Sequence, residues 1–175
     1  MKTSSELDAI ALFGSCARGD RDSMSDRDIL ILSDNKSIRR SETLRLRRKG
    51  WSPVAFSWRR LERAGAQKRL FIQHLKLESR VLWDRNGRFR EYLTKFAPSQ
   101  EYRAEKASSH TLIGILESIP NSKIGRYWAL DVLAVGLRSL GVATLANHGV
   151  YRFSGDGILL GLRDIGILRA GDVDA

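Results

Sequence analysis

The stretch LFGSCARGDRDSMSDRDILIL, residues 12–32, joins two apolar segments through a loop rich in glycine, arginine and aspartate. The segments 8–13 and 28–32 are short and apolar and lie beside turn-forming residues, which is typical of buried strands. Asp26 and Asp28 stand two residues apart, and on an extended chain such residues point to the same face. The stretch therefore predicts a strand–loop–strand unit that presents two carboxylates together.

The residue types of this loop suit a phosphate and a metal ion. Two carboxylates on one face repel each other unless a cation lies between them, and Mg²⁺ binds through one or two carboxylates plus substrate phosphates. Gly14 and Ser15 form a small turn whose N–H groups can approach a triphosphate, and Arg18 is near enough in the sequence to meet the same charge. A polar turn without a ligand is the alternative, because glycine, aspartate and serine are common turn residues.

The rest of the N-terminal half alternates between helix and strand patterns. Residues 36–50, KSIRRSETLRLRRKG, predict a short helix with Ser41 as its cap and Gly50 at its left-handed end. A third strand is expected at 53–58, a helix at 67–78 and a further strand at RVLWD, residues 80–84. This alternation indicates an α/β arrangement.

The pattern changes after residue 87, and the remainder of the chain favours helices. The strongest is at 126–140, RYWALDVLAVGLRSL, where apolar positions nearly surround the helix and indicate either a buried helix or a partner surface. A boundary near residues 96–99, which include Pro98, gives two expected domains, 1–97 and 98–175. The second is expected to be helical and to support self-association.

The net charge of +10 is concentrated in one part of the chain. Residues 36–69 contain twelve lysines and arginines and only two acids, so this window accounts for the whole net charge. Such a window indicates contact with nucleic acid, a nucleotide or an anionic partner, while a solvated basic face is the alternative. We call residues 36–69 the basic window.

Cysteine usage and hydropathy point to the cytoplasm. The single cysteine, Cys16, excludes an internal disulfide framework. No cationic and apolar leader is recognised, and no apolar run approaches the roughly 20 residues of a membrane span. We therefore expect a cytoplasmic protein without a membrane partner.

The opening stretch resembles the signature of the DNA polymerase β-like nucleotidyltransferase superfamily, in which an apolar strand, Gly-Ser, a loop and Asp-x-Asp follow in that order. It is most similar to the small prokaryotic members, including minimal and aminoglycoside nucleotidyltransferases. Their loop commonly reads Gly-Ser-x-Ala-Arg-Gly-Asp, which is found here at Gly14, Ser15, Ala17, Arg18, Gly19 and Asp20. A weaker resemblance at 70–87 extends the similarity over roughly the first 95 residues.

The resemblance implies an α/β (α+β) nucleotidyltransferase core with a mixed sheet. It implies that Gly14 and Ser15 bind the triphosphate of an incoming nucleotide, with Arg18 as a further phosphate contact. Asp26 and Asp28 would be the catalytic residues and would hold two Mg²⁺ ions. The implied reaction transfers a nucleoside monophosphate, first of all AMP from ATP, to a hydroxyl of a protein or RNA and releases pyrophosphate.

One expected residue is missing from the sequence. The family usually presents a third carboxylate on the strand after the basic helix, and alignment by strand order puts Ala55 or Ser57 there. Three explanations stay open: another acid such as Glu62, Glu78 or Asp84 substitutes, an oligomeric neighbour supplies the acid, or catalysis is reduced or lost. In the last case the protein is a nucleotide-, nucleic-acid- or partner-binding module.

The acceptor is the least determined part of the prediction. An aminoglycoside is a polycation and would favour an acidic cleft, so the basic balance of this chain ranks that acceptor low. Minimal nucleotidyltransferases related to toxin–antitoxin pairs modify a partner protein, and other relatives act on the end of a tRNA. The basic window favours RNA or an anionic protein surface.

Overall fold

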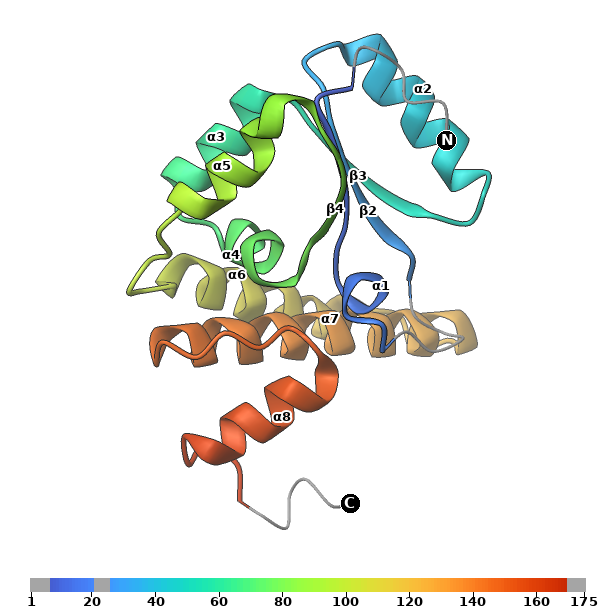
Figure 1. The fold of residues 1–175 in the computed structure, drawn as a ribbon. Coiled ribbons are helices and arrows are strands. Elements are labelled where there is room, and N and C mark those ends of the chain that lie inside the picture. The colour runs from blue at the N-terminus through green and yellow to red at the C-terminus, as the bar shows by residue number, and fades with distance from the viewer. Residues whose placement is uncertain (1–6, 21–25, 170–175) are drawn as a thin grey trace. The chain divides into compact units, whose positions relative to one another are not determined.

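The computed structural model describes residues 7–20 and 26–169 of the 175-residue chain. The chain divides into two compact units, residues 1–98 and 99–175, shown in Figure 1. The first unit holds the stretch that carries the predicted site, and the second unit is helical. Each unit is described by itself.

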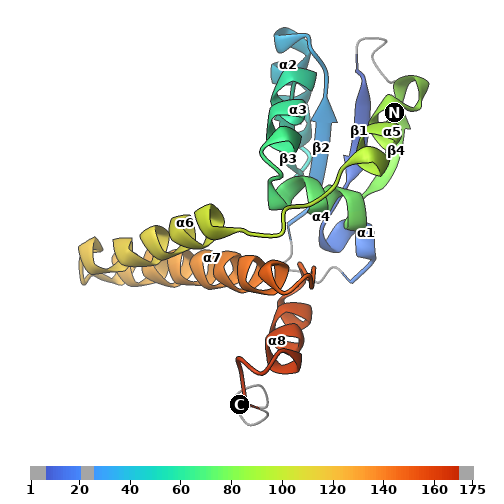
Figure 2. The ribbon, with the colours of Figure 1, turned by 90° about the vertical axis from the view of Figure 1, so that its left-hand side faces the viewer.

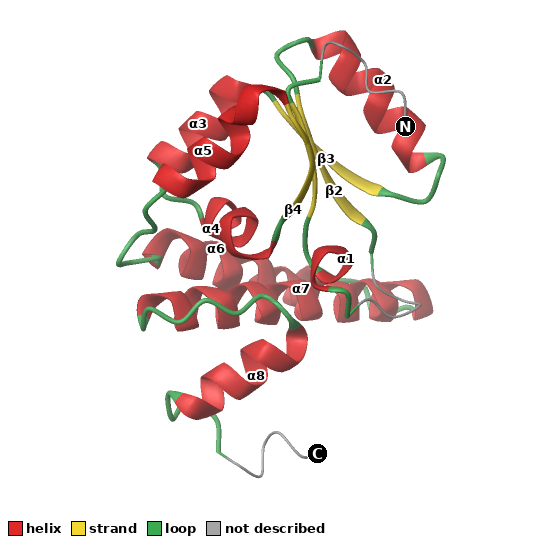
Figure 3. Ribbon diagram, viewed as in Figure 1, coloured by secondary structure: helices red, strands yellow, loops and turns green. Residues whose placement is uncertain are grey.

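A four-stranded sheet in the order β3-β2-β1-β4 forms the centre of the first unit. Figure 3 draws its strands in yellow. The strands are β1 at Ala9–Leu12, β2 at Asp28–Leu32, β3 at Ser52–Phe56 and β4 at Arg80–Asp84. β1 pairs antiparallel with β2 and β4, whereas β2 pairs parallel with β3. The predicted mixed sheet is therefore confirmed.

Helices cover both faces of this sheet (Figure 1). α2 lies on one face, and α3, α4 and α5 lie on the other. The helices of this unit are α1 at Ser15–Arg18, α2 at Lys36–Arg47, α3 at Trp58–Ala66, α4 at Leu70–Glu78, a 3₁₀ turn at Arg85–Gly87 and α5 at Arg88–Lys95. The helix expected from residue 67 begins at Leu70, because Lys68 has a left-handed φ of 50°.

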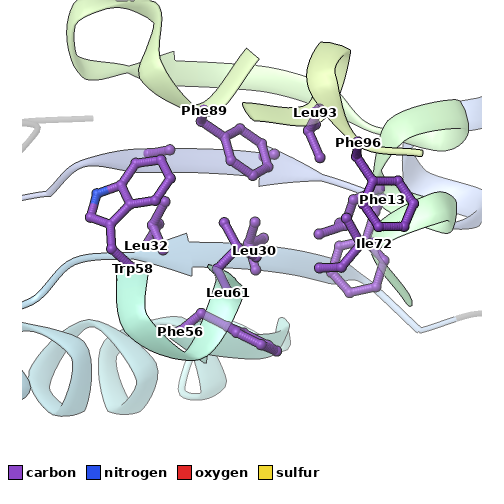
Figure 4. Close-up of a cluster of buried hydrophobic side chains, with 13 residues drawn as sticks. Phe13, Leu30, Leu32, Phe56, Trp58, Leu61, Ile72, Phe89, Leu93 and Phe96 are labelled. Atoms are coloured by element: carbon purple, nitrogen blue, oxygen red, sulfur yellow. The ribbon is translucent and has the colours of Figure 1, made fainter. Parts of the chain in front are cut away.

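Alternation along the central strands builds two hydrophobic cores. On β2, Leu30 and Leu32 point into the core beneath α3, α4 and α5, drawn in Figure 4, whereas Ile29 and Ile31 point toward α2. All four side chains are at most 1% exposed. Burial on both faces explains why β2 is a continuous apolar run.

The cap of α2 differs from the prediction. The N-cap of α2 is Asn35 rather than Ser41. The Asn35 side chain accepts hydrogen bonds from the backbone N–H groups of Ser37 and Ile38 at 2.9 and 3.2 Å. Ser41 lies inside the helix, and its hydroxyl donates to the carbonyl of Ile38. Gly50 follows the helix with a φ of 72°, as expected.

The second unit is helical, as predicted. It contains α6 at Arg103–Gly114, a 3₁₀ turn at Ile115–Ser118, α7 at Lys123–Asn147 and α8 at Gly155–Asp164. α6 packs along α7 (Figure 2), and the two helices approach closely at Gly136. A Cβ atom at Gly136 would lie 2.6 Å from Cγ1 of Ile113, so this contact requires glycine.

α7 is not the buried helix that one alternative predicted. It exposes large apolar side chains along much of its length, including Ile124 at 82% and Trp128 at 53%. By length and composition α7 also qualifies as a candidate membrane span, with a mean hydropathy of 1.6 over 18 residues, 39% of that window being buried. The expectation that no segment meets this criterion is therefore wrong: Asp131 and Arg138 interrupt the apolar run without lowering its mean hydropathy enough.

Candidate functional site

The Gly14 turn and the carboxylate of Asp28 lie against each other. The backbone N–H of Phe13 donates to the carbonyl of Asp28 at 3.3 Å, which brings the end of β1 beside the start of β2. A Cβ atom at Gly14 would lie 2.9 Å from Oδ2 of Asp28. Gly14 also has φ 63° and ψ −149°, a conformation that essentially only glycine adopts.

The turn continues directly into α1. The carbonyl of Gly14 accepts hydrogen bonds from the N–H groups of Ala17 and Arg18, at 3.0 and 3.1 Å. The first N–H groups of such a turn have no intrahelical acceptor. The thiol of Cys16 donates to the carbonyl of Asp26 at 3.7 Å. This bond links α1 to the segment that leads into β2.

Of the two predicted metal ligands, Asp28 is the first residue of β2, and Asp26 lies two residues before it. Asp28 is half-buried and alternates in phase with Leu30, so its side chain belongs to the sheet face that α3, α4 and α5 cover. Asp26 is exposed on the segment that leads into the strand. Both residues offer carboxylate oxygens, which are the donors that Mg²⁺ prefers, and the structure places one of them against the predicted phosphate-binding turn.

The register of β3 corrects the expected position of the third carboxylate. Asp28 pairs with Ser52, so Ser52 and Val54 share its sheet face. Ala55 lies on the opposite face, packed against the core beneath α2. Ser57 caps α3 by accepting a hydrogen bond from the N–H of Arg60. The predicted positions were therefore wrong, and the correct ones carry serine and valine.

Two of the three substitute acids have other partners. Glu62 forms an exposed ion pair with Arg88 at 3.1 Å. The side chain of Asp84 is fully buried and accepts hydrogen bonds from the N–H groups of Phe89 and Arg90, at 3.0 and 2.9 Å, at the start of α5. Within residues 7–20 and 26–169, no group of three histidine, cysteine, aspartate or glutamate side chains is placed to hold a metal ion.

The third substitute acid, Glu78, pairs with Arg18. Arg18 also donates to Asp20 at 2.8 Å, and Nε2 of His74 lies 3.3 Å from the Glu78 carboxylate. Burial favours the neutral form of Glu78, but hydrogen bonds from His74 and Arg18 outweigh it and lower its pKa. Burial likewise opposes the charge on Arg18, but hydrogen bonds with Asp20 and Glu78 raise its pKa. Arg18 is thus a charged group held in place at the end of α1.

The pairing of Glu78 with Arg18 was not visible in the sequence. The two residues are 60 positions apart, and no local spacing links α1 to the end of α4. In the sequence, Arg18 stood out only as part of the loop pattern, and Glu78 only as an acid within the weaker resemblance at 70–87. The two side chains meet only because α4 packs against the sheet.

This pair predicts a pH-dependent contribution to stability. Because the folded-state pKa of Glu78 lies below the ordinary glutamate value of 4.5, its contribution to stability is present above pH 4.5 and is lost as pH falls through the lowered pKa. We expect Glu78→Gln to lower the free energy of unfolding by about 1 to 2 kcal/mol at pH 7, since it weakens two charge-assisted hydrogen bonds. Urea denaturation at pH 7 and near the acid limit of folding measures both effects.

The matched control for this measurement is Glu91→Gln on α5. Glu91 also has a lowered pKa, caused by its hydrogen bond to Lys95, but the pair is fully exposed and contributes little to stability. Equal losses in the two variants, or a Glu78→Gln loss that persists unchanged at low pH, would contradict the assigned pairing.

The structure thus joins a small Gly-Ser turn to a strand carboxylate where the two central strands of a mixed sheet meet, at the end of β1 and the start of β2. Residues 1–87 match the family model described as "Polymerase beta, Nucleotidyltransferase". Through this N-terminal region the chain belongs to the polymerase β-type nucleotidyltransferase family, as the resemblance implied.

The wider comparisons add partial structural likenesses. A mutant of the toxin–antitoxin complex MntA-HpeT is 19% identical, with a TM-score of 0.38, and covers 52% of this chain and 72% of its own. A toxin–antitoxin structure with AMP-PNP is 21% identical, with a TM-score of 0.39, and covers 53% of this chain and 73% of its own. No curated protein matches the chain.

Proposed function

We propose that this protein transfers a nucleoside monophosphate, in the first instance AMP from ATP, to a hydroxyl group of an RNA or protein acceptor. The observation that supports the proposal best is the packing of the Gly14 turn against the Asp28 carboxylate. The contact supports the proposal because the turn that we expect to bind phosphate lies against the carboxylate that we expect to bind the metal. We expect the reaction to take place in the cytoplasm, where nucleoside triphosphates are made.

Each residue of the site has a separate role in the proposed reaction. Gly14 and Ser15 bind the triphosphate, and Arg18, held by Glu78 and Asp20, lies at the end of the same turn as a further phosphate contact. Asp26 and Asp28 would hold Mg²⁺, and the metal would supply positive charge that neutralises the phosphates and the departing pyrophosphate.

The bond changes follow from this arrangement. The acceptor oxygen forms a bond to the α-phosphorus while the bond from that phosphorus to the bridging oxygen breaks, so pyrophosphate leaves with the electron pair. The acceptor proton passes to solvent or to a base outside the assigned set. Correct placement of both groups supplies much of the rate acceleration in such a reaction.

A specific observation favours a second candidate function, a nucleotide-binding module with reduced or lost catalysis. The face of β3 beside Asp28 carries Ser52 and Val54, neither of which can replace a carboxylate as a ligand or base. Glu62, Glu78 and Asp84 are engaged elsewhere. In this alternative the turn still binds a nucleotide, but nothing is transferred.

One assay separates the two candidates. The protein is incubated with Mg²⁺, cell lysate and each of the α-labelled nucleoside triphosphates in turn, and the RNA and protein fractions are then separated. Label in either fraction supports the transferase. Measurable nucleotide binding without label transfer from any donor would favour the binding module and overturn the transferase.

We further propose that the second unit mediates self-association. α7 and α8 line an apolar groove of about 620 Å³, and Leu137, which is 53% exposed, forms part of its wall. We expect light scattering to give twice the chain mass of 19.7 kDa for the natural protein and a single chain for Leu137→Glu, because a buried unpaired carboxylate opposes association.

Leu44→Glu is the matched control for this prediction. Leu44 is 47% exposed on α2 in the first unit, so the same substitution there removes a similar side chain without altering the groove. A natural protein that stays monomeric at high concentration, or an oligomer that survives Leu137→Glu, would contradict the proposal.

A further inference from the structure

Part of the basic window gathers at the C-terminal end of α2. Arg47, Arg48 and Lys49 are exposed there, and Arg27 lies close by on β2's leading segment. The guanidinium of Arg27 lies over the indole ring of Trp51, 4.1 Å from the ring centroid. We call these four cations and Trp51 the α2-end cluster.

The α2-end cluster is at the same end of the sheet as the candidate active site. Arg27 directly precedes Asp28, and its carbonyl accepts a hydrogen bond from the N–H of Ser52 at 2.9 Å. Because β2 and β3 are parallel, the segment that leaves α2 enters β3 beside the start of β2. The cluster therefore lies next to the position at which Asp28 enters the sheet.

At this end of the sheet, one face carries a carboxylate and the other face carries cations. Alternation along β2 places Asp28 on the face covered by α3, α4 and α5, whereas Arg27 stacks on Trp51, which packs against the core beneath α2. A ligand that crosses this end of the sheet would meet the cations on one side of β2 and the Asp28 carboxylate on the other.

The cations of the cluster have no acidic partner among the residues that the structure describes. Elsewhere on α2, Arg45 forms an ion pair with Glu42 at 2.6 Å and Arg39 donates to the carbonyl of Ser33. Among the residues that the structure describes, none of the four cations of the α2-end cluster forms an ion pair with a carboxylate. Their charge is therefore available to an external anion.

We propose that the α2-end cluster binds the phosphates of a single-stranded polynucleotide and delivers its terminal hydroxyl to the site at Asp28. The delivery of the hydroxyl rests on the proposed function, nucleotidyl transfer at Asp28, and the polynucleotide is the class of acceptor for that transfer. Spaced cations match the repeating phosphates of such a strand. The Trp51 ring also holds the Arg27 guanidinium plane in place, and nucleobases stack on such planes.

The stacked pair favours a polynucleotide over an acidic protein. Carboxylates of an acidic polypeptide would satisfy the charges of Arg47, Arg48 and Lys49 equally well. They would make no use of the Arg27–Trp51 stack, whose flat surface complements a base. The two classes of ligand therefore differ in their dependence on Arg27 and Trp51.

Fluorescence anisotropy tests this inference with the full-length protein, using a labelled single-stranded RNA, a DNA of the same sequence and polyglutamate as probes. We expect binding of RNA or DNA that weakens with salt. We expect Arg47→Glu/Arg48→Glu to weaken it at least tenfold and to reduce the slope of log K against log salt by about 1.4, since each phosphate contact on a single strand contributes about 0.7.

Charge-matched and site-matched variants make the test specific. Arg59→Glu/Arg63→Glu reverses the same charge on α3, outside the cluster, and we expect a loss several-fold smaller. Arg27→Gln should weaken binding of the oligonucleotides more than that of polyglutamate. Asp28→Asn should leave oligonucleotide binding intact while it removes label transfer, so the surface and the chemistry are tested separately.

Several results would overturn the inference. These are no binding of either oligonucleotide at low salt, equal losses in the α2 and α3 double variants, or polyglutamate binding as tight as that of RNA. If the protein binds the oligonucleotides but transfers no label, the α2-end cluster remains a polynucleotide-binding surface and the proposed function is rejected. If label is transferred to protein and no oligonucleotide binds, the proposed function stands and the polynucleotide-binding role of the cluster is rejected.

Discussion

We expect the Asp28→Asn variant to lose label transfer by at least about 10²- to 10³-fold, the scale on which enzymes depend on a single electrostatic group at the reacting centre. Asparagine keeps the size of the side chain and removes its charge. The variant should therefore retain the contact with Gly14 but bind Mg²⁺ and the triphosphate poorly. Asp26→Asn should show the same direction of effect, because Asp26 is the second proposed Mg²⁺ ligand and lies two residues before Asp28.

The control for these variants is Asp164→Asn, which removes an aspartate charge on α8 in the second unit. The side chain of Asp164 is 66% exposed and forms only a 3.5 Å ion pair with Arg163. We expect full transfer from this variant. Circular dichroism and the unfolding midpoint show whether each variant is folded, and transfer by a folded Asp28→Asn at the natural rate would remove Asp28 from the catalytic role.

The second large effect is expected from Gly14→Ala. Alanine at this position would have to adopt φ 63° and ψ −149°, at a cost of about 1 to 3 kcal/mol. Its Cβ atom would also lie 2.9 Å from Oδ2 of Asp28, so the carboxylate would have to move. We expect nucleotide binding and transfer to fall together, as measured by equilibrium titration and by the labelling assay.

Gly19→Ala separates strain from the contact with Asp28. Gly19 also has a positive φ, 83°, but nothing lies within 4 Å of the position that its Cβ atom would occupy. We expect a modest loss of stability and a much smaller loss of nucleotide binding than for Gly14→Ala. Equal losses of binding in the two variants would mean that the contact with Asp28 has no functional importance.

The parts of the fold that were predicted from sequence are those determined by local patterns. The apolar runs at β1 and β2 and the left-handed Gly50 depend on a few neighbouring residues, and the structure contains each of them. The spacing of Asp26 and Asp28 is likewise local, and their joint role as metal ligands stays a prediction. The approach of the Gly14 turn to Asp28 was expected from the residue types of the loop as well as from the family resemblance.

The predictions that failed depended on information that is not local. The face of β3 beside Asp28 is determined by the register of two strands, and a shift of one residue exchanges Val54 for Ala55. The cap of α2 required a choice between Asn35 and Ser41, both acceptable residue types. The apolar pattern of α7 indicates that it needs a partner but does not reveal whether that partner lies within the chain.

The most direct test of the central proposal, nucleotidyl transfer at the Gly14–Asp28 site, compares ATP labelled at the α-phosphate with ATP labelled at the γ-phosphate. The two samples are incubated under the same conditions with the natural protein, Mg²⁺ and lysate. We expect the α-label in the macromolecular fraction and the γ-label in pyrophosphate. Transfer of the γ-label to the acceptor, or retention of both labels in intact ATP, would contradict the proposal.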